Sequence, residues 1–140
     1  LFCVDIYFII VVGSDFMSTK EINVLVLAYL GDTIYENYVR KYLIKSGIGN
    51  VNDLQGKAIS FVSASSQAKF VTRMLDNDFL TDEEVEVFKR ARNYKTTSHP
   101  KSCDIITYKF ATGLEAVIGY LELENKRERI DEIMKFILGD

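Results

Sequence analysis

Hydrophobic residues recur at helical spacing along most of this chain and nowhere alternate as they would in a strand. Polar cap and turn residues divide the pattern into segments. Ser18 or Thr19 is expected to cap the first helix and Gly47 to end it. The segments predict helices over about 19–45, 53–76, 83–91, 106–123 and 127–138. The pattern therefore predicts an all-α fold, a helical bundle.

Two local features sharpen this prediction. Thr81 followed three residues later by Glu84 is the signature of a capping box at a helix start. Gly31 lies inside the first apolar segment, where a glycine weakens a helix by about 1 kcal/mol relative to alanine. A glycine in that position indicates that another part of the chain packs closely against the backbone.

One stretch, residues 92–105, has no periodicity and holds the only proline and the only histidine. Loops of this length in compact domains are usually functional or disordered.

Composition supports one helical domain. The 140 residues are 48% hydrophobic and 26% charged, and a single proline and eight glycines favour long, unbroken elements. Cys3 and Cys103 have neither metal-ligand spacing nor the number needed for a disulfide framework. The cysteines are therefore uninformative, and a reducing cytoplasm is the default location that we expect.

The first sixteen residues are apolar but differ from the rest. The run from Ile6 to Val12 is far shorter than the ~20 residues that span a bilayer. A signal peptide is disfavoured because no basic residue precedes it. We expect Met17 to be the natural start, residues 1–16 to be a non-native upstream extension and residues 17–140 to form the domain. Without Asp5 and Asp15 the net charge of −3 becomes −1.

Two acidic residues interrupt apolar helical segments. Asp32 follows the apolar run that ends in Leu30-Gly31, and an ionised carboxylate there is either a helix cap or has a cation beside it. Glu36 follows one turn later on the same face. Glu115 is the lone charge among residues 110–120, and lies either on a solvent-facing stripe or inward. If both point inward, their oxygens suit a hard cation such as Mg²⁺.

A basic segment separates these two acidic residues. Between positions 89 and 109 there are six lysines and arginines and one acid, Asp104. The segment is either a solvated face or a surface for a phosphate backbone, to which its neutral hydroxyl and amide side chains would contribute. His99 has no nucleophile nearby in the sequence, and no zinc motif or phosphate-binding loop is present.

These motifs resemble a known family. Residues 27–36, with Leu30-Gly31-Asp32 at their centre, resemble the Leu-Gly-Asp signature of the ribonuclease III catalytic domain, and residues 112–119 resemble its second carboxylate motif. Residues 92–95, 100–101 and 107–112 are similar to the compact Mini-III branch. The similarity runs in order from about Ile22 to the C-terminus.

The resemblance implies an all-α ribonuclease III-type domain that acts as a homodimer and cleaves double-stranded RNA with Mg²⁺. It implies maturation of the ends of the large-subunit (23S) ribosomal RNA precursor, with a ribosomal protein presenting the substrate. Asp32 and Glu115 would be the catalytic and metal-binding residues, with Glu36 beside the metal. The expected RNA-binding residues are Arg92, Asn93, Lys95, Ser98, Lys101 and Lys109.

Two departures from the family pattern keep other functions open. Ala28 and Thr112 stand where conventional ribonuclease III has further carboxylates, which favours one firmly bound cation over two. No double-stranded-RNA-binding domain is recognisable, so the basic loop and a dimer surface would have to hold the duplex. The alternatives are a catalytically inactive RNA-binding or ribosome-assembly module on the same fold and an all-α dimeric scaffold.

Overall fold

The computed structural model describes residues 17–96 and 98–139, so the prediction for residues 1–16 lies outside the described residues. The described part is helical and contains no strand, which confirms the all-α prediction. None of its helices is long and apolar enough to cross a membrane. The elements are η1 (Thr19–Glu21), α2 (Val24–Lys45), α3 (Val51–Val62), α4 (Ala64–Asp76), α5 (Asp82–Arg92), α6 (Ile105–Leu123) and α7 (Arg127–Leu138).

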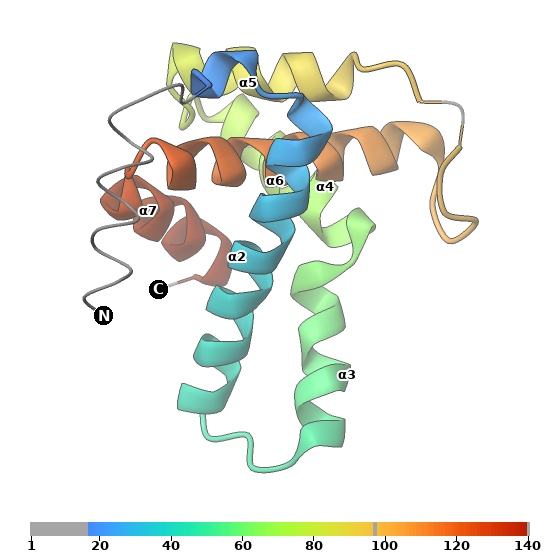
Figure 1. Ribbon diagram of the computed structural model, residues 1–140. Helices are drawn as coiled ribbons and strands as arrows, with labels where there is room; N and C mark the ends of the chain where they lie inside the picture. Colours follow the sequence, from blue (N-terminus) through green and yellow to red (C-terminus); the bar gives the residue numbers. More distant parts are fainter. Residues whose placement is uncertain (1–16, 97, 140) are drawn as a thin grey trace.

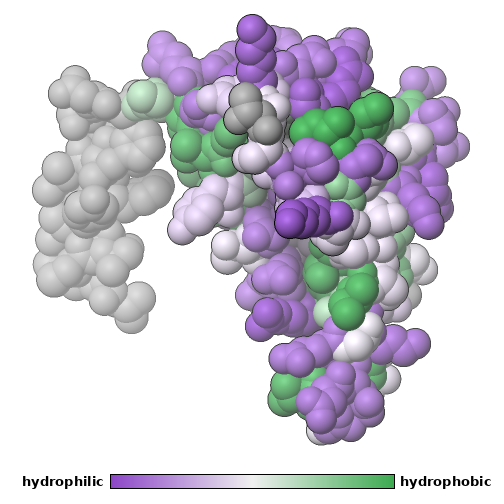
Figure 2. Space-filling model, turned by 90° about the vertical axis from the view of Figure 1, so that its right-hand side faces the viewer, coloured by the Kyte–Doolittle hydropathy of each residue, from purple (hydrophilic) through white to green (hydrophobic). Residues whose placement is uncertain are grey.

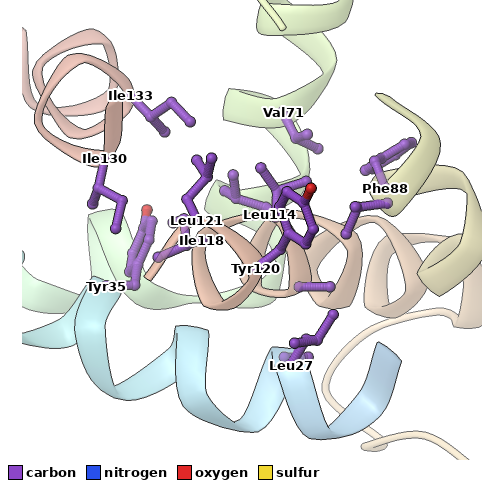
Figure 3. Close-up of a cluster of buried hydrophobic side chains, with 14 of the residues drawn as sticks. Leu27, Tyr35, Val71, Phe88, Leu114, Ile118, Tyr120, Leu121, Ile130 and Ile133 are labelled. Atoms are coloured by element: carbon purple, nitrogen blue, oxygen red, sulfur yellow. The ribbon is translucent and has the colours of Figure 1, made fainter. Parts of the chain in front are cut away.

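Helix α6 runs through the middle of the molecule and packs against α2, α4, α5 and α7 (Figure 1). It is buried on nearly all sides because almost every residue from Ala111 to Leu121 is apolar or small. Helices α2 and α3 extend together away from this body. The core lies around α6, where Leu114, Ile118 and Leu121 meet side chains from the surrounding helices (Figure 3).

Two glycines allow α2 and α6 to cross with their backbones in contact. A Cβ atom on Gly31 would lie 1.7 Å from the carbonyl oxygen of Glu115, and one on Gly119 would lie 1.9 Å from the carbonyl oxygen of Leu27. No side chain fits at either position. The close packing predicted at Gly31 is therefore confirmed.

The structure corrects two predicted boundaries. Helix α2 is capped by Asn23, whose side chain accepts from the Leu25 N–H, and not by Ser18 or Thr19. The predicted helix over 53–76 is two helices. Ser63 has an extended backbone (φ −63°, ψ 151°), and its hydroxyl oxygen caps α4 by accepting from the Ser66 N–H.

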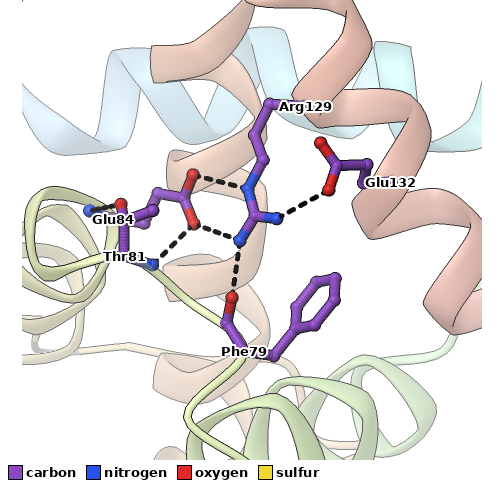
Figure 4. A network of polar contacts seen from close by, with 5 residues as sticks. All are labelled: Phe79, Thr81, Glu84, Arg129 and Glu132. Atoms are coloured by element: carbon purple, nitrogen blue, oxygen red, sulfur yellow. Dashed lines mark hydrogen bonds and ion pairs between the residues drawn. The ribbon is translucent and has the colours of Figure 1, made fainter.

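The capping box at α5 is present and belongs to a larger network (Figure 4). Glu84 is buried, and its carboxylate accepts from the Thr81 N–H and from the Arg129 guanidinium at 2.9 Å. Arg129 also donates to the Phe79 carbonyl oxygen. This ion pair, with a buried Glu84 and a half-buried Arg129, holds α7 against the start of α5.

Candidate active site

Asp32 lies in the middle of α2, directly after the glycine where α2 crosses α6. It is therefore not a helix cap, and the capping alternative is wrong. Asp32 is exposed, and it lies on the same face of α2 as Glu36, which follows one turn later. Glu36 is half-buried and pairs with Arg40 at 3.7 Å.

Glu115 lies on α6 at the same crossing. All other residues from Ala111 to Leu121 are buried, and Glu115 alone is half-buried. Because its backbone carbonyl touches Gly31, its side chain starts beside Asp32, and the two carboxyl groups come within hydrogen-bonding reach. The solvent-stripe alternative for Glu115 is wrong. The structure brings together the two acidic residues that the sequence singled out.

Among the residues that the structure describes, no positive charge is a leading influence on the Glu115 carboxyl group. Burial first, and then the neighbouring Asp32 and Glu36 carboxylates, raise its pKa to about 9. The Gln67 side chain partly opposes this rise. In the absence of a cation Glu115 is therefore protonated at neutral pH and can donate to Asp32. A divalent cation held by these residues would offset the repulsion and favour release of this proton.

The positions of Ala28 and Thr112 add no carboxylate to this pair. Ala28 is buried, and the Thr112 hydroxyl donates to the Tyr108 carbonyl oxygen at 2.9 Å. Among the described residues no group of three or more histidine, cysteine, aspartate or glutamate side chains could hold a metal ion. The hard oxygen atoms of Asp32 and Glu115 fit a cation that keeps several of its water molecules, as Mg²⁺ does.

Tyr35 ties this site to the start of α4. Its ring is fully buried, and its hydroxyl donates at 2.6 Å to the Phe61 carbonyl oxygen at the end of α3. Burial raises the pKa of Tyr35, and the charge of Glu115 raises it further once that group is ionised, so the phenol stays a donor. The bond pairs one of the carbonyl groups that a helix end leaves free. It fixes the break at Ser63, from which α4 begins.

Gln67 is a site residue that the sequence reasoning missed. It is 3% exposed, and its side chain acts on Glu115 by favouring the ionised carboxylate, which lowers the pKa of that group. A signal was available, because Gln67, Val71 and Met74 share one helical face and are the buried residues of α4. An amide at an otherwise apolar position of such a stripe indicates a polar partner inside the protein.

The predicted RNA-binding residues lie around the loop between α5 and α6. Arg92 ends α5, where its guanidinium covers the Phe88 ring at 5.7 Å and donates to the Asn93 side chain. Asn93 is the C-cap of α5. Lys95, Ser98 and Lys101 are exposed on the loop, and Lys109 is half-buried on α6. His99 is exposed, and its Nδ1 lies 2.9 Å from the Pro100 carbonyl oxygen, apart from the acidic pair.

Comparison with known proteins agrees with this arrangement. The profile of the ribonuclease III domain matches residues 25–126. Mini-ribonuclease 3 of Clostridium tetani is 43% identical over 91% of this chain and 85% of its own length. Mini-ribonuclease 3 of Brevibacillus brevis is 46% identical over 81% of this chain and 83% of its own length. A crystal structure of a protein from Fusobacterium nucleatum, 35% identical, superposes with a TM-score of 0.76 over 86% of this chain and 94% of that one.

An all-helical domain with paired carboxylates at a helix crossing, matched by this profile, defines an endoribonuclease of the ribonuclease III type. The chain belongs to the ribonuclease III family and, within it, to the branch of the Mini-ribonuclease 3 proteins. Enzymes of this family act on double-stranded RNA and generally depend on a divalent metal ion.

Proposed function

We propose that this protein is a Mg²⁺-dependent endoribonuclease that cuts double-stranded RNA at the site formed by Asp32 and Glu115. The observation that carries the proposal is the convergence of these two carboxyl groups where α2 crosses α6. Asp32 faces solvent, from which a phosphodiester can approach, whereas Glu115 lies deeper. Glu36, on the same face of α2, adds negative charge beside the pair without joining it.

The residues supply oxygen ligands and a rigid spacing. Asp32 and Glu115 would hold the Mg²⁺, which would supply water activation for in-line attack on the phosphodiester and positive charge against the developing charge on its oxygens. Asp32 and Glu115 come from separate helices whose backbones touch, so their separation is set before any ligand binds. Glu115 must release its proton for this role, and Gln67 assists by favouring the ionised carboxylate.

The direct test is incubation of the purified protein with duplex RNA, with Mg²⁺ and with a chelator. We expect cleavage of the duplex only with Mg²⁺, and little cleavage of single strands of the same sequence. Duplex binding without cleavage under all metal conditions would instead favour an inactive RNA-binding module. Neither binding nor cleavage would favour the dimeric scaffold.

Lys95 and Lys101 are proposed to hold the RNA backbone. Replacing both by glutamine is expected to weaken duplex binding and to reduce the slope of log affinity against log salt by roughly 2, because each phosphate contact contributes about 0.9. Fluorescence anisotropy with labelled duplex and a chelator, over a range of KCl, measures this slope.

A matched control for this pair is the replacement of Lys126 and Lys135 by glutamine. Both are exposed and lie at or in α7, on the opposite side of the molecule from the loop (Figure 1). The control should keep the wild-type slope. Equal slopes for the wild type and the Lys95/Lys101 variant would show that the loop does not contact the RNA backbone.

The homodimer is proposed to form through an exposed apolar face of α2. Val26 is 56% exposed and Tyr29 is 81% exposed, on the turns that precede Asp32. The apolar patch that Figure 2 shows where α2 and α3 are joined is a separate one, at the other end of α2 from Val26 and Tyr29. Large apolar side chains grouped beside a functional residue are typical of an interface. A second copy of the chain would cover them and place two sites in one particle.

Tyr29→Glu is expected to convert the dimer to a monomer, because burying an unpaired carboxylate in an apolar contact costs several kcal/mol. Sedimentation velocity at micromolar protein measures the change in mass. Ile106→Glu, at a 66% exposed position at the start of α6, serves as the control and should remain dimeric. A dimer of unchanged affinity in Tyr29→Glu would place the interface elsewhere.

The proposed substrate is the large-subunit (23S) ribosomal RNA precursor in the cytoplasm. Support comes from the similarity to the Mini-ribonuclease 3 proteins. A protein that recognises duplex RNA by its shape and backbone has little sequence preference. We therefore propose that a ribosomal protein presents the correct stem to the enzyme. Cleavage of a precursor stem should exceed cleavage of an unrelated duplex of the same length, and should rise further when the stem is bound by that protein.

A further inference from the structure

Gln67 is one of three buried polar or charged residues among those the structure describes. The other two have structural partners: Glu84 is paired with Arg129, and Thr112 donates to the backbone of its own helix. An amide removed from water without a hydrogen bond destabilises the fold by roughly 1–3 kcal/mol. Gln67 is a buried residue of α4, which packs against α6, and its side chain lowers the pKa of Glu115, so we take the Glu115 carboxyl group to be its partner.

The break between α3 and α4 determines where Gln67 lies. Ser63 ends α3 and caps α4, and its hydroxyl oxygen accepts from the Ser66 N–H. Gln67 follows in the first turns of α4, on the face that packs against α6. Tyr35 fixes the same break from the other side through the Phe61 carbonyl oxygen. The hydrogen bonds at the break between α3 and α4 thus position the neutral amide of Gln67 on the side of Glu115, the deeper of the two acidic residues.

The chemistry of a carboxamide suits this place better than that of other polar groups. Its N–H₂ group can donate to one oxygen of the Glu115 carboxylate and leave the other oxygen for a cation. A lysine or arginine there would repel the cation, and an aspartate or glutamate would add a further negative charge to the pair. The amide restrains the carboxylate without changing the charge of the site.

We propose that Gln67 is a positioning residue that orients the Glu115 carboxylate for cation binding. The inference rests on the proposed function of Asp32 and Glu115 as a cation site. Hydrogen-bond partners of metal ligands hold those ligands in their binding orientation, and their loss typically weakens metal binding 10- to 100-fold. Gln67 acts through Glu115 and does not itself contact the cation.

The test replaces Gln67 by methionine, which has similar length and shape but no donor. Mn²⁺ binding to the RNA-free protein is measured by electron paramagnetic resonance, with Asp32→Asn defining which part of the signal belongs to the site. We expect Gln67→Met to weaken that binding at least 10-fold while the thermal unfolding midpoint in chelator stays near the wild-type value. In cleavage assays the Mg²⁺ concentration for half-maximal rate should rise, with little change in KM for RNA.

Gln55→Met is the matched control, because Gln55 is exposed on α3 and carries the same substitution. It should leave Mn²⁺ binding unchanged. Gln67→Asn keeps the amide but withdraws it by one methylene, and should also lose Mn²⁺ affinity if Gln67→Met does not fold. Wild-type Mn²⁺ affinity in either folded Gln67 variant overturns the inference.

The same measurements separate failure of this inference from failure of the proposed function. If Asp32→Asn loses Mn²⁺ and Gln67→Met keeps it, the cation site stands and the role of Gln67 falls. If Asp32→Asn binds Mn²⁺ as the wild type does, the cation site itself is wrong and the inference falls with it.

Discussion

Asp32→Asn and Glu115→Gln are each expected to reduce the rate of duplex-RNA cleavage by about three orders of magnitude. Each removes a negatively charged oxygen ligand from a site with only two, and metal-ion catalysis supplies several kcal/mol of transition-state stabilisation. Single-turnover cleavage of a labelled duplex at saturating Mg²⁺ measures the effect. Cleavage at the wild-type rate by either variant would contradict the assignment of the site.

A stability measurement shows that such a loss is not caused by misfolding. The folded chain holds a proton on Glu115 up to about pH 9, whereas the unfolded chain releases it near 4.5. Without metal, the stability contributed by this proton is therefore lost as the pH rises from about 4.5 to 9, by at most about 1.4 kcal/mol per pH unit. Asp32→Asn removes a cause of the raised pKa, so in chelator its loss of stability with rising pH should level off at a lower pH than in the wild type. An unchanged dependence of the unfolding temperature on pH would mean that the two carboxyl groups do not interact.

Gly31→Ala is expected to destabilise the fold by roughly 3–5 kcal/mol, since it forces the backbones of α2 and α6 apart. The added Cβ would meet the Glu115 carbonyl oxygen at 1.7 Å, where no flexible side chain can move away. Gly119→Ala should behave in the same way. Thermal and urea unfolding measure the change, and the midpoint should fall by more than 10 °C.

The control for the glycines is Gly56→Ala on α3, where an added Cβ has no atom within 4 Å. It should stabilise the protein by about 0.5–1 kcal/mol, as alanine does in place of glycine in a helix. Equal effects of the Gly31 and Gly56 substitutions would show that backbone contact at the crossing contributes nothing.

Local patterns predicted most of the helices because their causes are local. The Thr81–Glu84 capping box and the positive φ of Gly47, at 96°, follow from neighbouring residues alone. Ser18 and Thr19 were expected to cap α2, but they precede a short η1 turn, and the Thr19 hydroxyl donates to Glu124 near the other end of the chain. A contact of this kind has no local signature.

The candidate site was predicted in part for the same reason. Asp32 and Glu115 each stood out as a charge in an apolar helix, but only the α2–α6 crossing joins them. Gln67 was missed because the 53–76 region was interpreted as one helix. A single helix would have no break at Ser63, and so nothing to show that a new helix with its own buried face begins there. Residues 63–67 are small and mostly polar, but the role of Ser63 as a cap depends on the conformation of one residue.

The backbone contact between Gly31 and Glu115 also determines how the protein can fluctuate. The amide groups next to the two acidic residues belong to the crossing on which the core is built, so hydrogen exchange there requires α2 to separate from α6. Local opening of the site and global unfolding are then the same event. The enzyme would have no partly unfolded state that keeps its fold and loses its catalytic geometry.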